Sequence, residues 1–308
     1  MRSLSSVLAE RDLVLDGGLA TELEARGHDL RDTLWSARLL RDDPLAIEDV
    51  HVSYFAAGAD VAITASYHAT LEGFEAVGID REEGRRLLRL SVELAQRARE
   101  RAGGKGIVAG SVGPYGVVFA NGCEYTGDYA RTPDDRIAQT QRERISELGG
   151  AGADVVALET VPNGREAAVV GELLAEFPEI EAWVSFCCLD GERLSDGTPI
   201  GNAIRAAGRT GRVAAFGVNC TAPQHVDSLL VAARQATDLP LVVYPNAGRA
   251  WDGDTYTWSG AGVERFAAEL VARWRDLGAR AIGGCCGIGP AAIAEIAATS
   301  GPETARTW

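Results

Sequence analysis

The sequence predicts an α/β protein, a single (β/α)8 TIM barrel domain over residues 1–308. Three features predict this fold. Short apolar runs alternate with stretches long enough for a helix, glycine recurs where a helix gives way to a strand, and polar residues follow the ends of several apolar runs. The alternative is an open doubly wound sheet. No Gly-x-Gly-x-x-Gly turn follows the first strand, and no Pro- or Ser-rich linker divides the chain, so the barrel is favoured.

Each predicted strand is a short apolar run bounded by turn residues. The eight strands are residues 13–15, 61–66, 107–110, 155–158, 183–186, 213–218, 241–244 and 279–282. Three junctions that lead from a helix to a strand resemble one another, at residues 57–60, 151–154 and 277–280, and each has glycine at its second position. Glycine is typical of the residue that ends a helix, because it adopts a left-handed backbone conformation without strain.

The starts of two helices can be predicted in more detail. Asp80 is expected to cap one helix, with Glu83 as its capping-box partner. A later helix is expected to have Thr132 as its cap and Pro133 at its first position. The apolar face of this later helix is expected to comprise Ile137, Ile145 and Leu148.

Composition and charge exclude several classes of protein. The net charge of −14 argues against a nucleic-acid surface, which needs a basic footprint. No apolar run approaches the ~18 residues of a membrane helix, and the first 11 residues contain no hydrophobic block of the kind found in signal peptides. The six cysteines include two adjacent pairs and nothing marks the chain as secreted, so we expect no disulfides and a cytoplasmic location.

A glycine-bounded cysteine pair, Cys285-Cys286 in GGCCG, directly follows the last predicted strand. Glycine on both sides is typical of a ligand site at a strand end, because the backbone turns sharply there and another group approaches closely. Cys220, after the sixth strand, is the candidate third ligand, since barrel strands six and eight end near each other. Three thiolates and one vacant position are the arrangement of a catalytic zinc site, whereas structural zinc sites have four protein ligands.

Other polar residues also follow strands, where barrels carry their catalytic groups. These are Asp16, Tyr67, Glu159 and Asn246. Asp16 precedes two glycines and has the alternative of a turn carboxylate, whereas Glu159 closes an apolar strand and needs a polar partner. Cys187 and Cys188 lack flanking glycine and are expected to pack in the core. No ligand spacing, and no catalytic base, is expected among His28, His51, His68 and His225.

Several sequence blocks together resemble the homocysteine S-methyltransferase family over nearly the whole chain. They are DGGLATEL (residues 16–23), GVNC (217–220) and GGCCG (283–287). Further blocks are similar to the branch of the family that uses S-methylmethionine as methyl donor. These are residues 34–37, 62–67, 110–116, 124–129, 194–199 and 242–246.

The resemblance implies a zinc-dependent barrel enzyme with small-molecule substrates. Zinc would be held by Cys220, Cys285 and Cys286 and would activate the thiol of homocysteine, which accepts a methyl group from S-methylmethionine to give methionine. Asp16 and Glu159 would hold the homocysteine amino group, with the amides near Gly17 and Gly18 facing its carboxylate. Apart from the aromatic candidates given below, the expected substrate-binding residues are Asp16, Gly17, Gly18, Glu159 and Asn219.

A sulfonium donor should be held by aromatic faces and carboxylates. The aromatic candidates are Trp35, Tyr67, Tyr115, Tyr125 and Tyr129, and Glu124 is a candidate for added negative charge. The segment 111–128 is long for a barrel loop and is either a lid that excludes water or an ordinary surface loop. Thr160 occupies a place where some relatives have an aromatic residue that reaches the metal, so water is expected in the vacant position here.

Three other functions are considered. The same acceptor could be used with S-adenosylmethionine or betaine; a methyl-folate donor is least expected, because those enzymes need further domains. A zinc-dependent barrel hydrolase or lyase would be expected to use histidine and carboxylate ligands. A non-enzymatic zinc or redox protein would place four protein ligands on the metal. The oligomeric state is not predicted.

Overall fold

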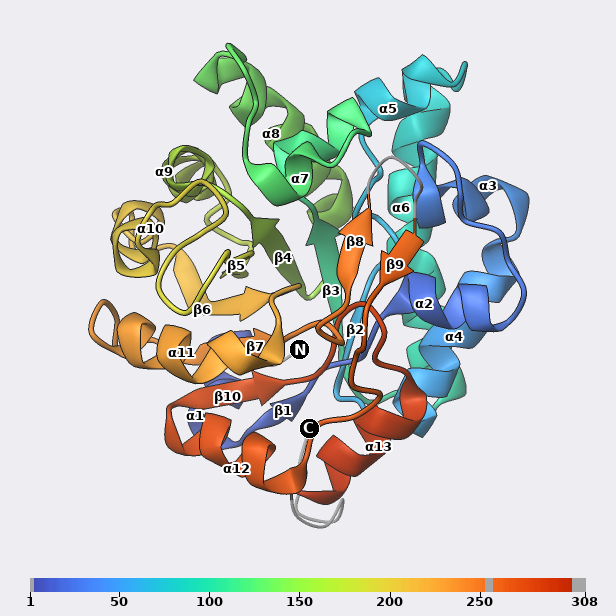
Figure 1. Cartoon of the computed structure of the whole chain (residues 1–308). Helices are drawn as coiled ribbons and strands as arrows, with labels where there is room; N and C mark the ends of the chain where they lie inside the picture. The colour runs from blue at the N-terminus through green and yellow to red at the C-terminus, as the bar shows by residue number, and fades with distance from the viewer. Residues whose placement is uncertain (1–2, 253–256, 301–308) are drawn as a thin grey trace.

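Eight parallel strands form one closed sheet in the structure, a computed structural model that describes residues 3–252 and 257–300 (Figure 1). The strands are β1 (Leu13–Val14), β2 (Val61–Ile63), β3 (Ile107–Val112), β4 (Val155–Val161), β5 (Ala182–Phe186), β6 (Val213–Asn219), β7 (Leu241–Tyr244) and β10 (Ala279–Ile282). Their order is β1-β10-β7-β6-β5-β4-β3-β2, and a parallel bridge from Leu15 to Val61 joins the two ends of the sheet. The predicted barrel and its eight strands are therefore confirmed; the extent of the domain over residues 1–308 stays a prediction.

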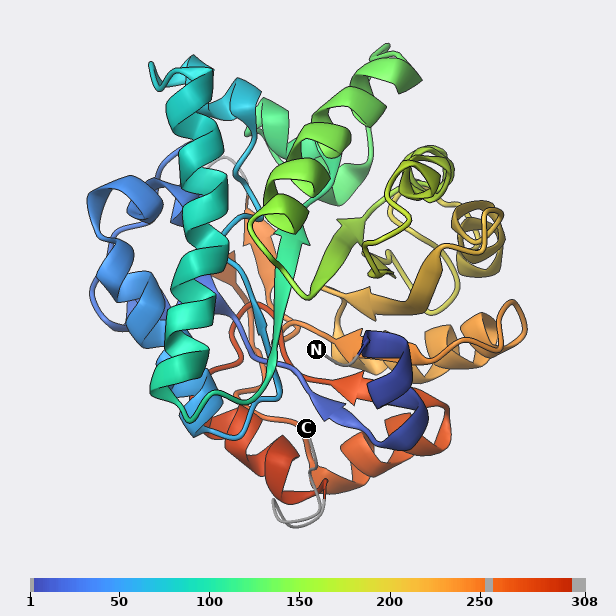
Figure 2. The same ribbon diagram turned by 180° about the vertical axis from the view of Figure 1, so that it is seen from behind.

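A layer of helices surrounds the barrel (Figures 1 and 2). The longer helices are α4 (Pro44–Ala56), α6 (Arg81–Arg101), α8 (Asp134–Gly150), α9 (Gly164–Leu173), α10 (Ile200–Ala207), α11 (Val226–Arg234), α12 (Ala268–Asp276) and α13 (Pro290–Ala298). Shorter ones are α1 (Leu4–Glu10), α2 (Leu19–Ala25), α3 (Leu39–Asp42), α5 (Leu71–Ala76), α7 (Cys123–Thr126), and the 3-10 turns η1 (Trp35–Arg38), η2 (Tyr115–Phe119), η3 (Leu174–Glu176) and η4 (Pro223–His225). Among the described residues, no helix has the length and apolar character needed to cross a membrane.

Two apolar cores follow from the alternation of side chains along the strands. Leu13 and Leu15 of the first strand point into the barrel, where they join side chains from the other strands and from α1, which packs across one end. Val14 points outward and belongs to the larger core between the strands and the surrounding helices. The barrel interior is therefore a packed core at the α1 end, and a cavity lined by residues that follow the strands lies at the other end.

Several strand bounds differ from the predicted ones. Strand β2 ends at Ile63, three residues earlier than predicted. Beyond it the Thr64 hydroxyl accepts from the Ser111 amide at 2.9 Å and lies 2.7 Å from the Ser66 hydroxyl. Such local side-chain bonds compete with regular strand pairing. Strand β3 instead extends to Val112 through its pairing with β4.

The predicted helix starts are partly correct. The Asp80 carboxylate caps α6 by accepting from the Glu83 amide at 2.9 Å, as predicted. The carboxylate of Glu83, however, binds Arg86 rather than returning to the cap. Helix α8 begins at Asp134, and Pro133 is the extended residue before it, so the predicted start was one residue too early. The expected apolar face of α8 is buried, as predicted: Ile137, Ile145 and Leu148.

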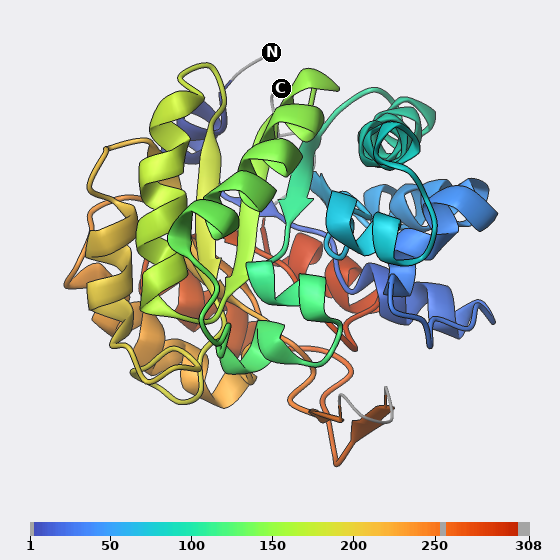
Figure 3. The same cartoon turned by 90° about the horizontal axis from the view of Figure 1, so that it is seen from above.

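The antiparallel hairpin of β8 (Ala250–Asp252) and β9 (Thr257–Ser259) after β7 was not predicted. Figure 3 shows the hairpin at the same end of the barrel as η2 and α7. This is the end at which the parallel strands terminate.

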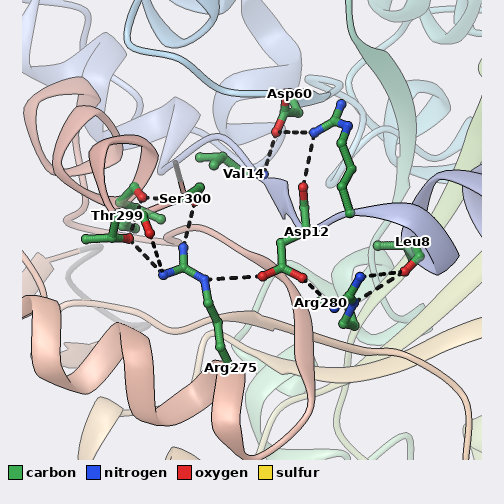
Figure 4. A network of polar contacts seen from close by, with 10 residues as sticks. Leu8, Asp12, Val14, Asp60, Arg275, Arg280, Thr299 and Ser300 are labelled. Atoms are coloured by element: carbon green, nitrogen blue, oxygen red, sulfur yellow. Dashed lines mark hydrogen bonds and ion pairs between the residues drawn. The ribbon is translucent and has the colours of Figure 1, made fainter. Parts of the chain in front are cut away.

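The opposite end is closed by a polar network around Asp12 (Figure 4). Its carboxylate oxygens lie 3.4 Å from Arg275 Nε and 3.0 Å from Arg280 Nη1. Arg275 also donates to the Thr299 carbonyl and hydroxyl beyond α13, and Arg280 donates to the Leu8 carbonyl of α1. The network therefore links both chain ends to the barrel, far from the strand ends where ligands bind.

Candidate active site

A cavity of about 620 Å³ opens at the carboxyl ends of the strands. Nearly all the predicted site residues line it, although they come from distant parts of the sequence. They are Asp16, Gly17, Gly18, Trp35, Tyr67, Glu159, Asn219, Cys220, Cys285 and Cys286. The parallel topology therefore brings together residues that the sequence indicated separately.

The three predicted zinc ligands meet at one side of this cavity. The sulfur atoms of Cys220, Cys285 and Cys286 all lie within 4.8 Å of one another, and those of Cys285 and Cys286 are 3.9 Å apart. Among the described residues, no other group of three or more His, Cys, Asp or Glu side chains has metal-ligand spacing. The histidine-rich site of a zinc hydrolase is therefore not found in this part of the chain.

Cys220 and Cys285 are joined as a disulfide, with their Cα atoms 5.7 Å apart. The expectation that the chain has no disulfide is therefore wrong for this structure. The physical reason is that the barrel brings residues separated by 65 positions within bonding reach, which the distribution of cysteines along the chain does not reveal. Only the reduced pair offers two thiolates to a metal, so the disulfide and the metal site are alternative states of the same sulfurs.

Strand β7 lies between β6 and β10, and its end and the turn after it form hydrogen bonds with the backbone of two of the cysteines. The Cys220 amide donates to the Tyr244 carbonyl, and the Cys285 amide donates to the Pro245 carbonyl at 2.9 Å. The Asn246 side chain donates to the Cys220 carbonyl at 3.1 Å. Asn246, which the sequence placed at a strand end, therefore acts on the backbone of a cysteine in the cluster.

Glycines around the cluster permit close contact between the turns after β1 and β10. A Cβ atom on Gly17 would lie 2.2 Å from the Ile288 carbonyl oxygen, and one on Gly283 would lie 2.6 Å from the Asp16 carbonyl oxygen. One on Gly284 would lie 2.3 Å from the Ile288 side chain. These distances are too short for any other residue, which accounts for the two glycines that precede the cysteine pair.

The predicted role of the Gly18 amide is wrong, because this amide donates to the Ile288 carbonyl at 2.9 Å. The same turn-to-turn contact that holds the cysteines uses the N–H group that was expected to face a substrate carboxylate. Gly18 still lines the cavity with its backbone. The other amides near Gly17 and Gly18 remain candidates for this role.

One residue of the cysteine cluster and one cavity residue, Thr160, have left-handed backbone conformations that are unfavourable for side chains with a Cβ atom. Thr160 has φ 62° and Cys220 has φ 44°. The Asn219 side chain stabilises this arrangement: its Oδ1 accepts from the Thr160 amide at 2.7 Å, and its Nδ2 donates to the Thr160 hydroxyl at 2.7 Å. Its polar atoms thus hold the protein itself, and its predicted binding of substrate stays a prediction.

Two buried carboxylates, Asp16 and Glu159, face the cavity. Asp16 Oδ2 accepts from the Ile63 amide at 2.8 Å, whereas its Oδ1 is buried and has no hydrogen-bond partner among the described residues. The Ser111 hydroxyl donates to Glu159 Oε1. Burial raises the pKa of Asp16 well above its usual value, and the charge of Glu159 adds to this. Burial likewise raises the pKa of Glu159 to about 7, partly offset by the Ser111 hydroxyl. A buried carboxylate is favourable only when it is protonated or paired with a cation, so a cationic group that enters the cavity could take the place of the proton.

An aromatic wall lies at another side of the cavity. The ring centroids of Trp35 and Tyr67 are 6.2 Å apart, and that of His68 lies 5.2 Å from Trp35 and 5.1 Å from Tyr67. The Tyr67 hydroxyl is buried without a hydrogen-bond partner among the described residues. Burial lowers the pKa of His68 to about 4, so its ring is neutral at neutral pH. Tyr125 also lines the cavity.

The remaining aromatic candidates lie behind this wall. Tyr115 does not line the cavity; its ring packs edge-on against Phe119 at 5.6 Å and Tyr129 at 5.7 Å. The Tyr129 hydroxyl donates to Glu166 at 2.6 Å. The position of these two rings therefore does not support the predicted substrate contact of Tyr115 or the predicted donor contact of Tyr129, because both belong to the internal packing of their loop.

Two further cysteines agree with their predicted core packing. Cys188 is buried in the larger core, and its amide donates to the Thr221 hydroxyl at 3.0 Å. Cys187 is also buried, with its sulfur 3.6 Å from the Cys220 carbonyl oxygen, and burial raises the pKa of its thiol to about 11. Neither sulfur belongs to the metal-spaced group.

Ser111 and Tyr244 line the cavity but were not predicted. Tyr244 is the last residue of a predicted strand, so the strand-end rule would have identified it. Ser111 follows the predicted end of strand three, and its role depends on β3 extending further than its apolar run.

Comparison with known proteins identifies the relatives of this chain. The family model described as homocysteine S-methyltransferase matches residues 13–300. The chain belongs to the homocysteine S-methyltransferase family. It is 46% identical over 295 residues to homocysteine S-methyltransferase YbgG of Bacillus subtilis, covering 93% of each chain. It is 45% identical over 306 residues to the homocysteine S-methyltransferase of Escherichia coli, covering 96% of this chain and 98% of that one. The predicted family and enzyme class are confirmed.

Solved structures of a family member have the same fold. The metallated form of the homocysteine methyltransferase MmuM from Escherichia coli matches with a TM-score of 0.85 and 43% identity, over 96% of this chain and 99% of that one. Its oxidized form matches with a TM-score of 0.86 and 42% identity, over 97% and 100% of the two chains. The family thus includes a protein solved in both a metallated and an oxidized state.

The raised pKa of Glu159 predicts a pH dependence of stability in the ligand-free protein. Because the folded protein holds this proton to higher pH than the unfolded chain, the free energy of unfolding should fall as the pH rises from about 4.5 to 7. Glu159→Gln keeps an acceptor for Ser111 and removes this loss. It should be more stable than the wild type at pH 8 by about 1–3 kcal/mol, and no more stable at pH 4.5. Urea unfolding across this pH range measures the difference.

The exposed carboxylate of Glu93 provides a matched control, because Glu93→Gln changes the same chemical group on the surface of α6. Its pH profile should follow that of the wild type. An unchanged profile in Glu159→Gln would show that the Glu159 carboxyl titrates as it does in the unfolded chain.

Proposed function

We propose that this protein transfers a methyl group from S-methylmethionine to the thiol of homocysteine, giving two molecules of methionine, with zinc held by Cys220, Cys285 and Cys286. The observation that carries the proposal is the convergence in one cavity of a three-sulfur cluster, a pair of buried carboxylates and an aromatic wall. Each part matches one chemical group of the two substrates.

The chemistry of the sulfur cluster supports zinc as the metal. Thiolates are soft ligands that zinc favours, and three protein ligands leave a position for a substrate atom. Zinc bound there would promote loss of the proton from a thiol that enters the fourth position, so that the thiolate is present at neutral pH. Thr160 offers only a short hydroxyl beside this site, and that hydroxyl already accepts from Asn219.

The carboxylates support an amino acid as the acceptor. The unpartnered Oδ1 of Asp16 and the carboxylate of Glu159 would receive the ammonium group of homocysteine and relieve the cost of their burial. The Gly17 amide would face its carboxylate. With the ammonium held at this end, the thiol reaches toward the cysteine cluster, whose residues line the same cavity.

The aromatic wall supports a sulfonium donor. Trp35, Tyr67 and Tyr125 all line the cavity, and aromatic rings attract cations. Beyond them Glu124 is buried, and its Oε2 has no hydrogen-bond partner among the described residues, so it adds negative charge on this side. The lid role of the segment 111–128 remains a proposal; the position of Tyr125 in the cavity supports it.

The proposed reaction needs no general acid. The homocysteine sulfur forms a bond to the methyl carbon as the bond from this carbon to the donor sulfur breaks. The bonding pair returns to that sulfur, so methionine leaves as a neutral thioether, and the thiol proton passes to solvent. This agrees with a cavity in which no histidine is among the lining residues.

The zinc assignment predicts the effect of removing one sulfur. Cys285→Ser should bind less than about a tenth of the zinc bound by the wild type and lose methyl transfer, because a neutral hydroxyl is a poor zinc ligand. Zinc content is measured on purified, reduced protein by atomic absorption.

Cys187→Ser is the matched control, since Cys187 is a buried cysteine next to the site that lies outside the sulfur cluster. It should retain a full equivalent of zinc. Full zinc content and activity in Cys285→Ser would contradict the proposal.

The donor assignment is tested by competition between methyl donors. The purified zinc protein is given homocysteine with S-methylmethionine, S-adenosylmethionine or betaine, each at the same concentration, and methionine formation is followed. S-methylmethionine should give the highest kcat/KM, because it presents a sulfonium and an amino-acid group to the aromatic wall and the carboxylate of Glu124 without the bulky adenosyl group of S-adenosylmethionine. Transfer from betaine or S-adenosylmethionine alone would refute the donor assignment while leaving homocysteine as the acceptor.

A further inference from the structure

We propose that Arg144, Gln141 and Glu166 form a positioning unit that holds the donor side of the cavity. None of the three lines the cavity, and all three are almost fully buried. This inference rests on the proposed function, because it takes the methyl donor to bind against Tyr67 and Tyr125.

Arg144 ties together the chain segments that follow β2 and β3. It projects from α8, and its side chain is completely buried. Its Nη2 donates to the carbonyls of Ser66 at 3.1 Å and Tyr67 at 2.6 Å, and its Nη1 donates to the carbonyl of Gly113 at 2.6 Å. One guanidinium thus fixes the backbone of an aromatic residue of the cavity and the start of the next loop.

Glu166 ties down both flanks of that loop, which we define as residues 113–129. It lies in the first turn of α9 and accepts from the Tyr115 amide at 2.8 Å and from the Tyr129 hydroxyl at 2.6 Å. Tyr125, which lines the cavity, lies between these two attachment points. The Asn163 side chain adds a bond to the Gly127 carbonyl at 3.1 Å.

Gln141 connects the two charged residues. Its Nε2 donates to Glu166 at 2.8 Å and to the Gly113 carbonyl at 3.0 Å, and its Oε1 accepts from Arg144 at 3.1 Å. Burial lowers the pKa of Arg144 to about 10, so the guanidinium stays charged at neutral pH. The unit is therefore a cation and an anion bridged by an amide, with bonds directed at loop backbone.

Packing alone does not require such a unit. Buried charged groups are costly, and apolar residues of similar volume often stabilise a fold equally well. Apolar residues cannot form directional hydrogen bonds. Five of the hydrogen bonds described above are made with backbone atoms of Ser66, Tyr67, Gly113 and Tyr115. A Cβ atom on Gly113 would lie 2.6 Å from the Tyr67 carbonyl oxygen, so the two segments that Arg144 joins are in direct backbone contact.

The homocysteine side of the cavity is held by different contacts. Asp16 and the cysteine turn are joined by the amide of Gly284, which donates to the Asp16 carbonyl at 3.0 Å, and by the close approach of Gly17 to Ile288. None of the hydrogen bonds from Arg144, Gln141 or Glu166 described above reaches these residues. The charge of Arg144 does act on Glu159, whose pKa it lowers, whereas Tyr129 donates to Glu166 and carries no charge of its own. Loosening the unit while leaving this charge in place should therefore impair donor binding selectively.

The test compares Arg144→Met with Arg142→Met, which removes an exposed arginine of the same helix that pairs with Glu176. In Arg144→Met the KM for the donor should rise about tenfold, because misplacement of binding groups by about 1 Å has effects of this size or larger. The KM for homocysteine should rise less than that for the donor, because Arg144 reaches Glu159 only through its charge, and the zinc content should stay within about twofold of the wild type. Arg142→Met should change none of these. The donor used is whichever one the wild type accepts, so failure of the S-methylmethionine assignment is seen separately in the wild type.

Tyr129→Phe removes a single hydroxyl from Glu166 and keeps the test decisive if Arg144→Met does not fold. It should raise the donor KM in the same direction by a smaller factor, about threefold. Amide hydrogen exchange, which needs no substrate, should be faster in residues 113–129 of both variants and unchanged near Asp16. Equal rises in the KM of both substrates, or wild-type donor KM and exchange in both variants, would overturn the proposal.

Discussion

The site depends on close contact between the turn after β1 and the turn after β10. The Gly284 amide donates to the Asp16 carbonyl, and the Gly18 amide donates to the Ile288 carbonyl. Glycine is required because a Cβ atom on Gly17 or Gly283 would overlap backbone atoms of the facing turn. This single contact places a carboxylate and two cysteine sulfurs on the wall of one cavity, and the turn after β7 brings Cys220 to them.

The cavity has two sides that are held by different means. On the side of Asp16 and the cysteines, backbone contacts between glycine-rich turns leave little freedom. On the side of Tyr67 and Tyr125, side chains from α8 and α9 reach inward to hold loop backbone. The buried carboxylates that line the cavity are Asp16 and Glu159, and the sulfur cluster lines the same cavity.

Local sequence patterns were sufficient for the barrel and for the cysteine cluster. Short apolar runs marked all eight strands, and the rule that strand ends carry function located Asp16, Glu159 and Cys220. What the sequence could not show were hydrogen bonds between residues far apart in the chain. The backbone amide of Gly18 donates to the Ile288 carbonyl. The side-chain oxygen of Asn219 accepts from the backbone amide of Thr160, 59 positions away. The buried position of Arg144 could not be predicted, because an arginine in a helix is usually exposed. The disulfide of Cys220 with Cys285 could not be predicted either, because only the closed barrel brings these two residues together.

The central claim is that three cysteine sulfurs hold a metal with one position left for the substrate thiol. X-ray absorption at the zinc edge of the reduced protein tests this claim directly. The account predicts three sulfur neighbours and one lighter neighbour without substrate, and four sulfur neighbours after homocysteine is added. Four sulfur neighbours before the addition, or a shell that homocysteine leaves unchanged, would contradict it.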